Sequence, residues 1–157
     1  MKTFFMYIAL VYVALAIQGM IFHGTKPDLV LILVCFFSVR HEQGRGMLFG
    51  ALAGLLTDIS SGFILGPNVF SKTMAAFLSR TIRENLFQWN IIISTFLIAS
   101  LSIIDIAIVH VCYEAFSKMS FVNRSWGVSV ATVAYTIAAS LMLYPLFHPR
   151  KEKTMWY

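Results

Sequence analysis

Charged residues are scarce in this chain. Only 12% of its 157 residues are Asp, Glu, Lys or Arg, whereas 59% are hydrophobic. A soluble domain carries about 25% charged residues, so this composition excludes an ordinary soluble domain and predicts an integral membrane protein. The net charge of +5 does not indicate nucleic-acid binding, because the basic residues lie between apolar runs, where they set membrane orientation.

Cysteines and catalytic motifs are also few or missing. The only two cysteines, Cys35 and Cys112, lie in separate apolar runs, which favours packing over a disulfide framework or a metal site. The sequence has no phosphate-binding glycine loop, no HExxH, no CxxC and no nucleophile motif. Ser60 and Ser61 follow Asp58 but have no histidine at a useful spacing. We therefore expect no enzyme, no cofactor and no metal.

Six stretches have the character of helices. The first, residues 4–22, is about 28 Å long as a helix, enough to cross the hydrocarbon core. Ala14 to Ala16 resemble a signal-peptide cleavage site, but the apolar run continues to Phe22, so we expect the segment to be retained. The predicted fold is a single all-α membrane domain with six transmembrane helices, at about 4–22, 28–39, 46–58, 67–83, 89–113 and 126–147, and a basic tail at 148–157.

Two of these helices and the segment between two others are unusual. The stretches at 28–39 and 46–58 are short, and residues 59–66 carry no charge, which predicts a loop dipping into the membrane or lying against it. The helix at 67–83 is amphipathic, so we expect it to face other helices or to run along the inner membrane surface.

The basic residues are distributed unevenly between the two sides. With six crossings, both termini and the loops near 40–45 and 80–88 share a side that holds Lys2, Arg40, Arg45, Arg80, Arg83, Arg150, Lys151 and Lys153. The opposite side holds only Lys26, Lys118 and Arg124. The positive-inside rule therefore places both termini in the cytoplasm. The four arginines at 40, 45, 80 and 83 could also contact anionic headgroups or a cytoplasmic filament, although topology alone explains them.

A glycine ridge marks the third helix. Gly46, Gly50 and Gly54 recur every fourth residue, and Asp58 continues the series, so the four lie along one face of a helix. Such a ridge lets another backbone approach closely, which is a usual way for helices to associate in lipid. The approaching helix belongs either to the same chain or to a partner protein.

Three charged residues are expected at membrane depth. Counted up from the loop at 40–45, Asp28 and Asp58 lie about 18–20 Å above the inner face, and Lys72 is near the same level. An unpaired charge inside a spanning helix costs about 2.5–3.5 kcal/mol. We therefore expect Asp58 and Lys72, with Asp28 or Lys26 nearby, to neutralise one another around a small recess open to the outside. This recess either binds a ligand or only satisfies the buried charges.

A further acid, Asp105, falls within the fifth helix. A proton relay with His110 is one interpretation. The favoured one is that Asp105 packs against hydroxyl groups or a lysine of another helix. His110 could also pair with Glu114, four residues further along the same helix.

The order of several motifs resembles one bacterial family, the rod shape-determining protein MreD. The resemblance covers about residues 27–80 and rests on the run Pro27 to Leu33, the charged loop with Arg40, the pattern G-xxx-G-xxx-G-xxx-D from Gly46 to Asp58, and Ser60-Ser61-Gly62 followed by Leu65-Gly66. Elsewhere the similarity is limited to hydropathy and the order of spans.

This resemblance implies a non-enzymatic membrane protein of the elongation (rod) complex, which builds the side wall of rod-shaped bacteria. The implied partners are MreC, a bitopic membrane protein, together with a RodA-type glycosyltransferase, its transpeptidase partner, the MreB filament and the lipid bilayer. The resemblance also implies a fold similar to the substrate-binding subunits of energy-coupling-factor transporters. The alternative function is therefore a small-solute-binding membrane subunit of a transporter, although no tryptophan or polar cluster capable of caging a vitamin is evident.

Overall fold

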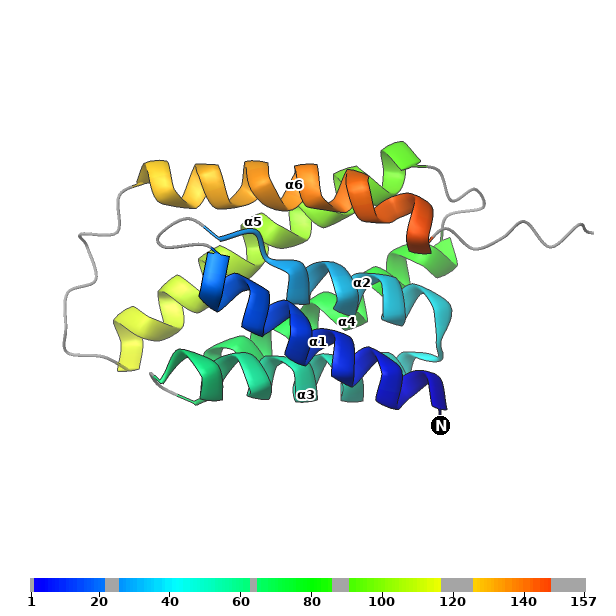
Figure 1. The fold of residues 1–157 in the computed structure, drawn as a ribbon, viewed down its shortest axis with the longest axis horizontal. Helices are drawn as coiled ribbons and strands as arrows, with labels where there is room; N and C mark the ends of the chain where they lie inside the picture. Colours follow the sequence, from blue (N-terminus) through cyan, green and yellow to red (C-terminus); the bar gives the residue numbers. More distant parts are fainter. Residues whose placement is uncertain (1, 22–25, 63–64, 86–90, 117–125, 148–157) are drawn as a thin grey trace, which may run out of the picture.

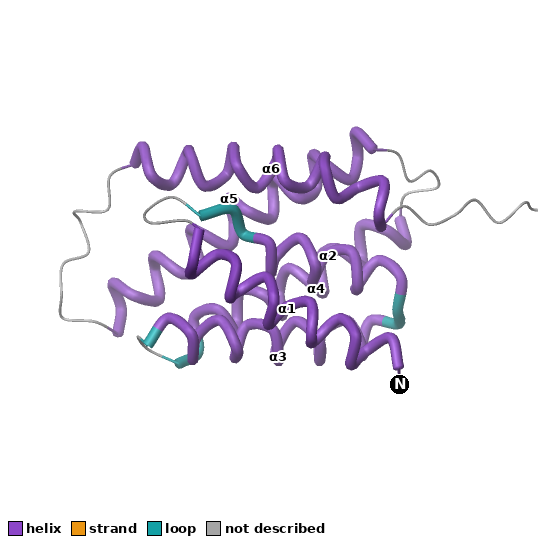
Figure 2. The backbone as a smooth tube through the Cα atoms, in the orientation of Figure 1, coloured by secondary structure: helices purple, strands orange, loops and turns teal. Residues whose placement is uncertain are grey.

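The chain is built from helices alone in the parts that are described. The computed structural model describes residues 2–21, 26–62, 65–85, 91–116 and 126–147, and Figure 2 shows only helices and loops in these ranges. The helices are α1 (Lys2–Ile21), α2 (Leu29–Arg40), α3 (Gln43–Ser61), α4 (Pro67–Asn85), α5 (Ile91–Phe116) and α6 (Trp126–Phe147). These six helices confirm the all-α prediction, and each begins and ends within three residues of its expected bounds. The expected basic tail at 148–157 lies outside the described residues.

Successive helices run in opposite directions along the long axis of the molecule. In Figure 1 the start of α1, the end of α2 and the start of α3 lie together at the right-hand end. Three helices contain segments long enough and apolar enough to cross a membrane: Thr3–Met20, Ile92–Cys112 and Gly127–Tyr144. These segments belong to α1, α5 and α6, and α2 is apolar but shorter.

Helix α2 lies at the centre of the bundle. It contacts each of the other five helices, and every residue from Val30 to Ser38 is buried. Asp28 caps its start by accepting a 2.8 Å hydrogen bond from the Leu31 N–H. The surroundings of α2 account for the short length of this helix, because a helix enclosed by protein does not have to match the thickness of the bilayer.

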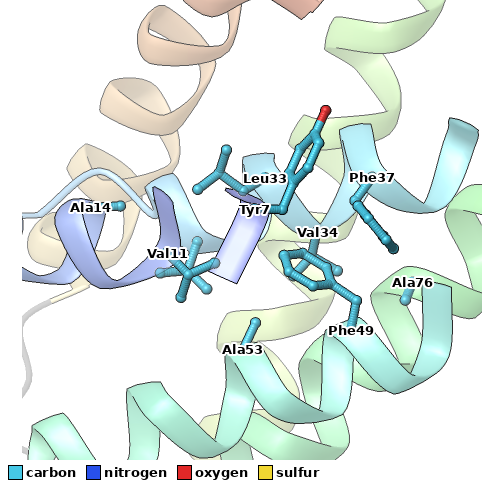
Figure 3. Close-up of a cluster of buried hydrophobic side chains, with 10 residues drawn as sticks. Tyr7, Val11, Ala14, Leu33, Val34, Phe37, Phe49, Ala53 and Ala76 are labelled. Carbon is cyan, nitrogen blue, oxygen red and sulfur yellow. The ribbon is translucent and has the colours of Figure 1, made fainter. Parts of the chain in front are cut away.

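The two sides of α2 belong to two apolar clusters. One cluster joins α2 to α1 and α3 and, through Ala76, to α4, and Figure 3 shows the side chains from these helices converging. Its aromatic centre places the ring centroids of Tyr7 and Phe37 5.1 Å apart, and those of Phe37 and Phe49 4.3 Å apart. The other cluster joins α2 to α4, α5 and α6 through residues such as Ile32, Ile98 and Tyr144.

The outer surface of the bundle is apolar. Large hydrophobic side chains are exposed along α1, α5 and α6, among them Phe5, Tyr12, Met20, Ile92, Phe96, Ile103, Val130 and Met142. Exposed apolar side chains in this number mark a surface for membrane or protein contact. The surface therefore fits a protein whose outer helices face lipid.

The segment between α3 and α4 differs from its prediction. We expected a loop over 59–66, but α3 continues to Ser61 and ends at Gly62, whose φ of 68° is left-handed. Glycine adopts this conformation without strain and commonly ends helices in this way. The loop prediction was therefore wrong for residues 59–61, where the helix extends one turn further than the small polar residues indicated.

Candidate functional site: a buried ion cluster beside a polar recess

The site begins with a lysine that is almost completely enclosed. Lys72 lies on α4, and its side chain is only 1% exposed. Its ammonium nitrogen donates to Asp28 Oδ2 at 2.5 Å and to Asp105 Oδ1 at 2.8 Å. Because a buried charge is tolerated only when it is paired and hydrogen-bonded, these two contacts fix α4 against α5 and the start of α2.

Hydroxyl groups extend this ion cluster of Asp28, Lys72 and Asp105. The Ser71 hydroxyl, also on α4, donates to Asp105 Oδ1. The backbone N–H of Asp28 donates to Thr136 Oγ1 at 2.9 Å, which brings in α6. The favoured interpretation of Asp105 is confirmed, because it packs against a hydroxyl and a lysine of another helix. The ion cluster thus links four of the helices that enclose it.

Asp58 has a different role from the one expected. It accepts backbone hydrogen bonds from Gly66 at 2.8 Å and from Asn68 and Val69 at 3.2 Å each. A further bond of 2.7 Å comes from the Asn68 side chain. These donors lie at the start of α4, where the free N–H groups and the helix dipole favour a carboxylate. The predicted pairing of Asp58 with Lys72 is therefore wrong: Asp58 caps α4, and Lys72 binds Asp28 and Asp105.

The glycine ridge makes room for helices of the same chain. A Cβ atom on Gly50 would lie 2.6 Å from the Lys72 carbonyl oxygen, and one on Gly54 would lie 2.6 Å from Val69 Cα. On Gly46 it would lie 3.0 Å from Ser38 Oγ, on α2. Of the two interpretations left open, packing within the chain is the one the structure shows. The ridge faces α4 and α2 and offers no free surface to a partner.

A polar recess lies beside the ion cluster. It is a cavity of about 440 Å³ between the last turns of α1 and α3, the starts of α2, α4 and α6, and the middle of α5. Most of its lining residues have polar or charged side chains. The lining comprises Gln18, Lys26, Pro27, Asp28, Val30, Thr57, Ser60, Ser61, Asn68, Ser102, Asp105, Ile106, Val109, His110, Ser129 and Thr132.

The recess has partly different walls from those predicted. Asp28 and Lys26 line it as expected, whereas Asp58 and Lys72 are not among its lining residues. Asp105 and His110 also line it, although the sequence did not lead us to assign them to the recess. The signal that could have identified this wall is the row of small hydroxyl residues on the expected fifth and sixth helices, including Ser102, Ser129 and Thr132.

The opposite end of the bundle carries the predicted arginines. Arg40 and Arg83 lie in the last turns of α2 and α4, where a positive charge complements the helix dipole. Arg80 Nε is 2.7 Å from Glu84 Oε1, and Arg80 Nη1 donates to the Val39 carbonyl oxygen at 3.4 Å. Arg45 Nε lies 3.7 Å from Glu42 Oε2. The four arginines therefore share one end, and the recess lies at the other.

This combination of three spanning-length apolar helices with an ion cluster enclosed among helices defines an α-helical membrane protein. Comparison with protein families identifies the group more narrowly. The family model of the rod shape-determining protein MreD matches residues 1–149, and the chain belongs to this family. The predicted resemblance is thus confirmed, and membership indicates a role in determining rod shape. Searches of curated proteins and of solved structures gave no match.

Proposed function

We propose that this protein is a non-enzymatic membrane scaffold of the elongation complex and supports side-wall peptidoglycan synthesis by binding an MreC-like bitopic protein. The observation that carries this proposal is the family match over residues 1–149. A RodA-type glycosyltransferase, its transpeptidase and the MreB filament are further proposed partners. The fold is consistent with a scaffold, because the glycine ridge and the ion cluster both make their contacts inside the bundle.

The proposed location is the bacterial cytoplasmic membrane, crossed six times, with both termini in the cytoplasm. In support, Arg40, Arg45, Arg80 and Arg83 gather at the end of the bundle where α1 begins, and cytoplasmic loops are enriched in basic residues. Two single-cysteine variants on a background without Cys35 and Cys112 test this: Gly44→Cys should react with an impermeant maleimide only after cell lysis. Lys26→Cys should react in intact spheroplasts, and the reverse pattern would overturn the orientation.

The proposed binding surface for a partner helix is the apolar exterior of the bundle. The glycine ridge is occupied by α4 and α2, so a transmembrane span of the partner would pack against exposed side chains of the outer helices. In lipid such packing depends on close van der Waals contact and hydrogen bonds between helices, because the hydrophobic effect gives no drive there.

Affinity purification tests the scaffold proposal directly. The tagged full chain, expressed in a rod-shaped bacterium from its own locus and extracted in mild detergent, should retain the MreC-like protein. A polytopic transporter with the same tag should not retain it. Depletion of the chain should also convert rods into spheres. Rods that persist after depletion, with no MreC-like protein retained, would contradict the proposal.

A second candidate function, binding of a small solute, is supported by the recess. Its volume of about 440 Å³ lies within the range of about 300–1,000 Å³ that is usual for small-molecule sites. The implied similarity to solute-binding transporter subunits agrees with it. Mass spectrometry of the purified protein separates the candidates: a retained bitopic protein supports the scaffold, and a retained small molecule supports solute binding.

A further inference from the structure

Asp105 belongs to both the ion cluster and the wall of the recess. Its side chain is only 9% exposed. Oδ1 accepts both of its hydrogen bonds, from Ser71 Oγ and Lys72 Nζ. Among the described residues no donor reaches Oδ2, although the carboxylate lines the cavity. Oδ2 is not sealed inside the protein, because Ser38 Oγ is the one fully buried side-chain N or O atom without a partner among the described residues. The recess is therefore the space from which a donor can reach Oδ2.

The charge of the ion cluster is also unbalanced. Two carboxylates, Asp28 and Asp105, face one ammonium group, that of Lys72. With both carboxylates ionised, one negative charge has no partner inside the cluster. Lys26 also lines the recess but is exposed, so its charge is largely screened by solvent. The recess thus offers an electrostatic site for one positive charge.

The rest of the wall supplies hydrogen-bond acceptors of the right kind. Hydroxyl groups of Ser102 on α5 and of Ser129 and Thr132 on α6 line the same cavity. A hydroxyl oxygen accepts a hydrogen bond from an N–H donor, and an ammonium group carries three such donors. Charge-assisted bonds to a largely buried carboxylate such as that of Asp105 are stronger than neutral ones.

We propose that the recess binds a small organic solute carrying a protonated primary amine. The ammonium group donates to Asp105 Oδ2 and to the hydroxyls of Ser102 and Ser129, with Thr132 beside them, and completes the charge balance with Lys72 and Asp28. The remainder of the solute occupies the cavity of about 440 Å³. This inference rests on the second candidate function and does not depend on the scaffold.

Thermal unfolding of the purified full chain in detergent tests the proposal, with ethanolamine hydrochloride as the probe. A ligand that binds only the folded state stabilises it by mass action. Ethanolamine should raise the Tm progressively with its concentration, by about 3 °C at roughly ten times its Kd. Equal concentrations of sodium chloride and of ethylene glycol, the neutral analogue, should not.

Variants locate the effect at the recess. Asp105→Asn removes the unbalanced charge and leaves Lys72 paired with Asp28, so it should fold and lose the ethanolamine response. Glu84→Gln, which removes a carboxylate at the opposite end of the bundle, should keep it. Ser129→Ala should retain the fold and need a several-fold higher ethanolamine concentration for the same rise in Tm, which keeps the test valid if Asp105→Asn fails to fold.

Each alternative outcome has a definite meaning. An equal rise in Tm with sodium chloride would indicate that the site binds an inorganic cation. A rise with ethylene glycol alone would support solute binding but contradict the requirement for an ammonium group. No rise with any probe, or an unchanged response in Asp105→Asn or Ser129→Ala, would also overturn the proposal. Because Asp105→Asn should still retain the MreC-like partner, failure here is distinguishable from failure of the scaffold.

Discussion

Helices α4 and α5 pack against each other but are held in the protein by different forces. Helix α5 contains an apolar segment, Ile92–Cys112, that is able to cross a membrane, and it exposes side chains such as Phe96 and Ile103. Helix α4 has no such segment, and it buries Ser71, Lys72 and Ser79. Hydropathy alone therefore accounts for α5 in a bilayer, whereas α4 depends on particular partners.

Three features that look unrelated in the sequence supply those partners. Gly50 and Gly54 let the backbone of α4 approach α3. Asp58 caps its start, and the ion cluster neutralises its lysine. The comparison of α4 with α5 indicates how a polar helix can be accommodated in a membrane bundle. Its backbone, its first N–H groups and its lysine each contact a particular group of a neighbouring helix.

The largest effect should come from removing the lysine of α4. Lys72→Met leaves Asp28 and Asp105 close together without a cation, and breaking a buried ion pair in this way costs about 3–5 kcal/mol. Most of the protein should then be lost as aggregate, measured by size-exclusion chromatography in detergent. Lys26→Met is the matched control, because Lys26 is exposed, and it should behave as wild type.

A compensating variant sharpens this test. Combining Lys72→Met with Asp28→Asn and Asp105→Asn removes every charge of the ion cluster, and neutral replacement of a whole buried ion cluster is often tolerated. Asparagine also remains a good helix cap in place of Asp28. The triple variant should recover most of the folded protein. If Lys72→Met and Lys26→Met behave alike, α4 is not held by the ion cluster.

A smaller loss should follow from filling the groove that α3 presents to α4. The Cβ atom of Gly54→Ala would meet the backbone of Asn68 and Val69, which cannot move aside as a flexible side chain can. Overpacking of this kind costs about 1–3 kcal/mol, measurable as a lower Tm. Gly44→Ala lies on the same helix and meets nothing within 4 Å, so it should be neutral or stabilising by up to about 1 kcal/mol.

Much of this arrangement was predictable because it is local in the sequence. Hydropathy and turn residues gave the six helices, and the spacing of Gly46, Gly50 and Gly54 gave the ridge. What the sequence could not give was the choice of partners. Lys72 lies 33 residues from Asp105 and 44 from Asp28, so its contacts depend on which helices are neighbours.

Two other features were hidden for a related reason. A run of apolar residues such as 29–39 has the same pattern whether the helix faces lipid or lies at the centre of a bundle. The central position of α2 therefore could not be inferred from the sequence. The height of Asp58 in the membrane suggested a lysine partner. Its actual partners are the Asn68 side-chain amide and three backbone N–H groups, and residue types do not reveal backbone donors.

The smallest of the three effects should come from the cap of α4, and it separates capping from ion pairing. Asp58→Asn keeps the size of the side chain but replaces one acceptor oxygen by a donor and removes a charge from the positive end of the helix. Removing a negative charge from a largely buried helix N-terminus costs up to about 2 kcal/mol. Hydrogen exchange should speed up at Asn68 and Val69 while the exchange of α5 is unchanged.

Glu84→Gln, which breaks only a surface pair with Arg80, should change stability by less than about 1 kcal/mol. Equal acceleration throughout α4 and α5 would mean that Asp58 supports the whole bundle, and the contrast between the two helices would then no longer hold.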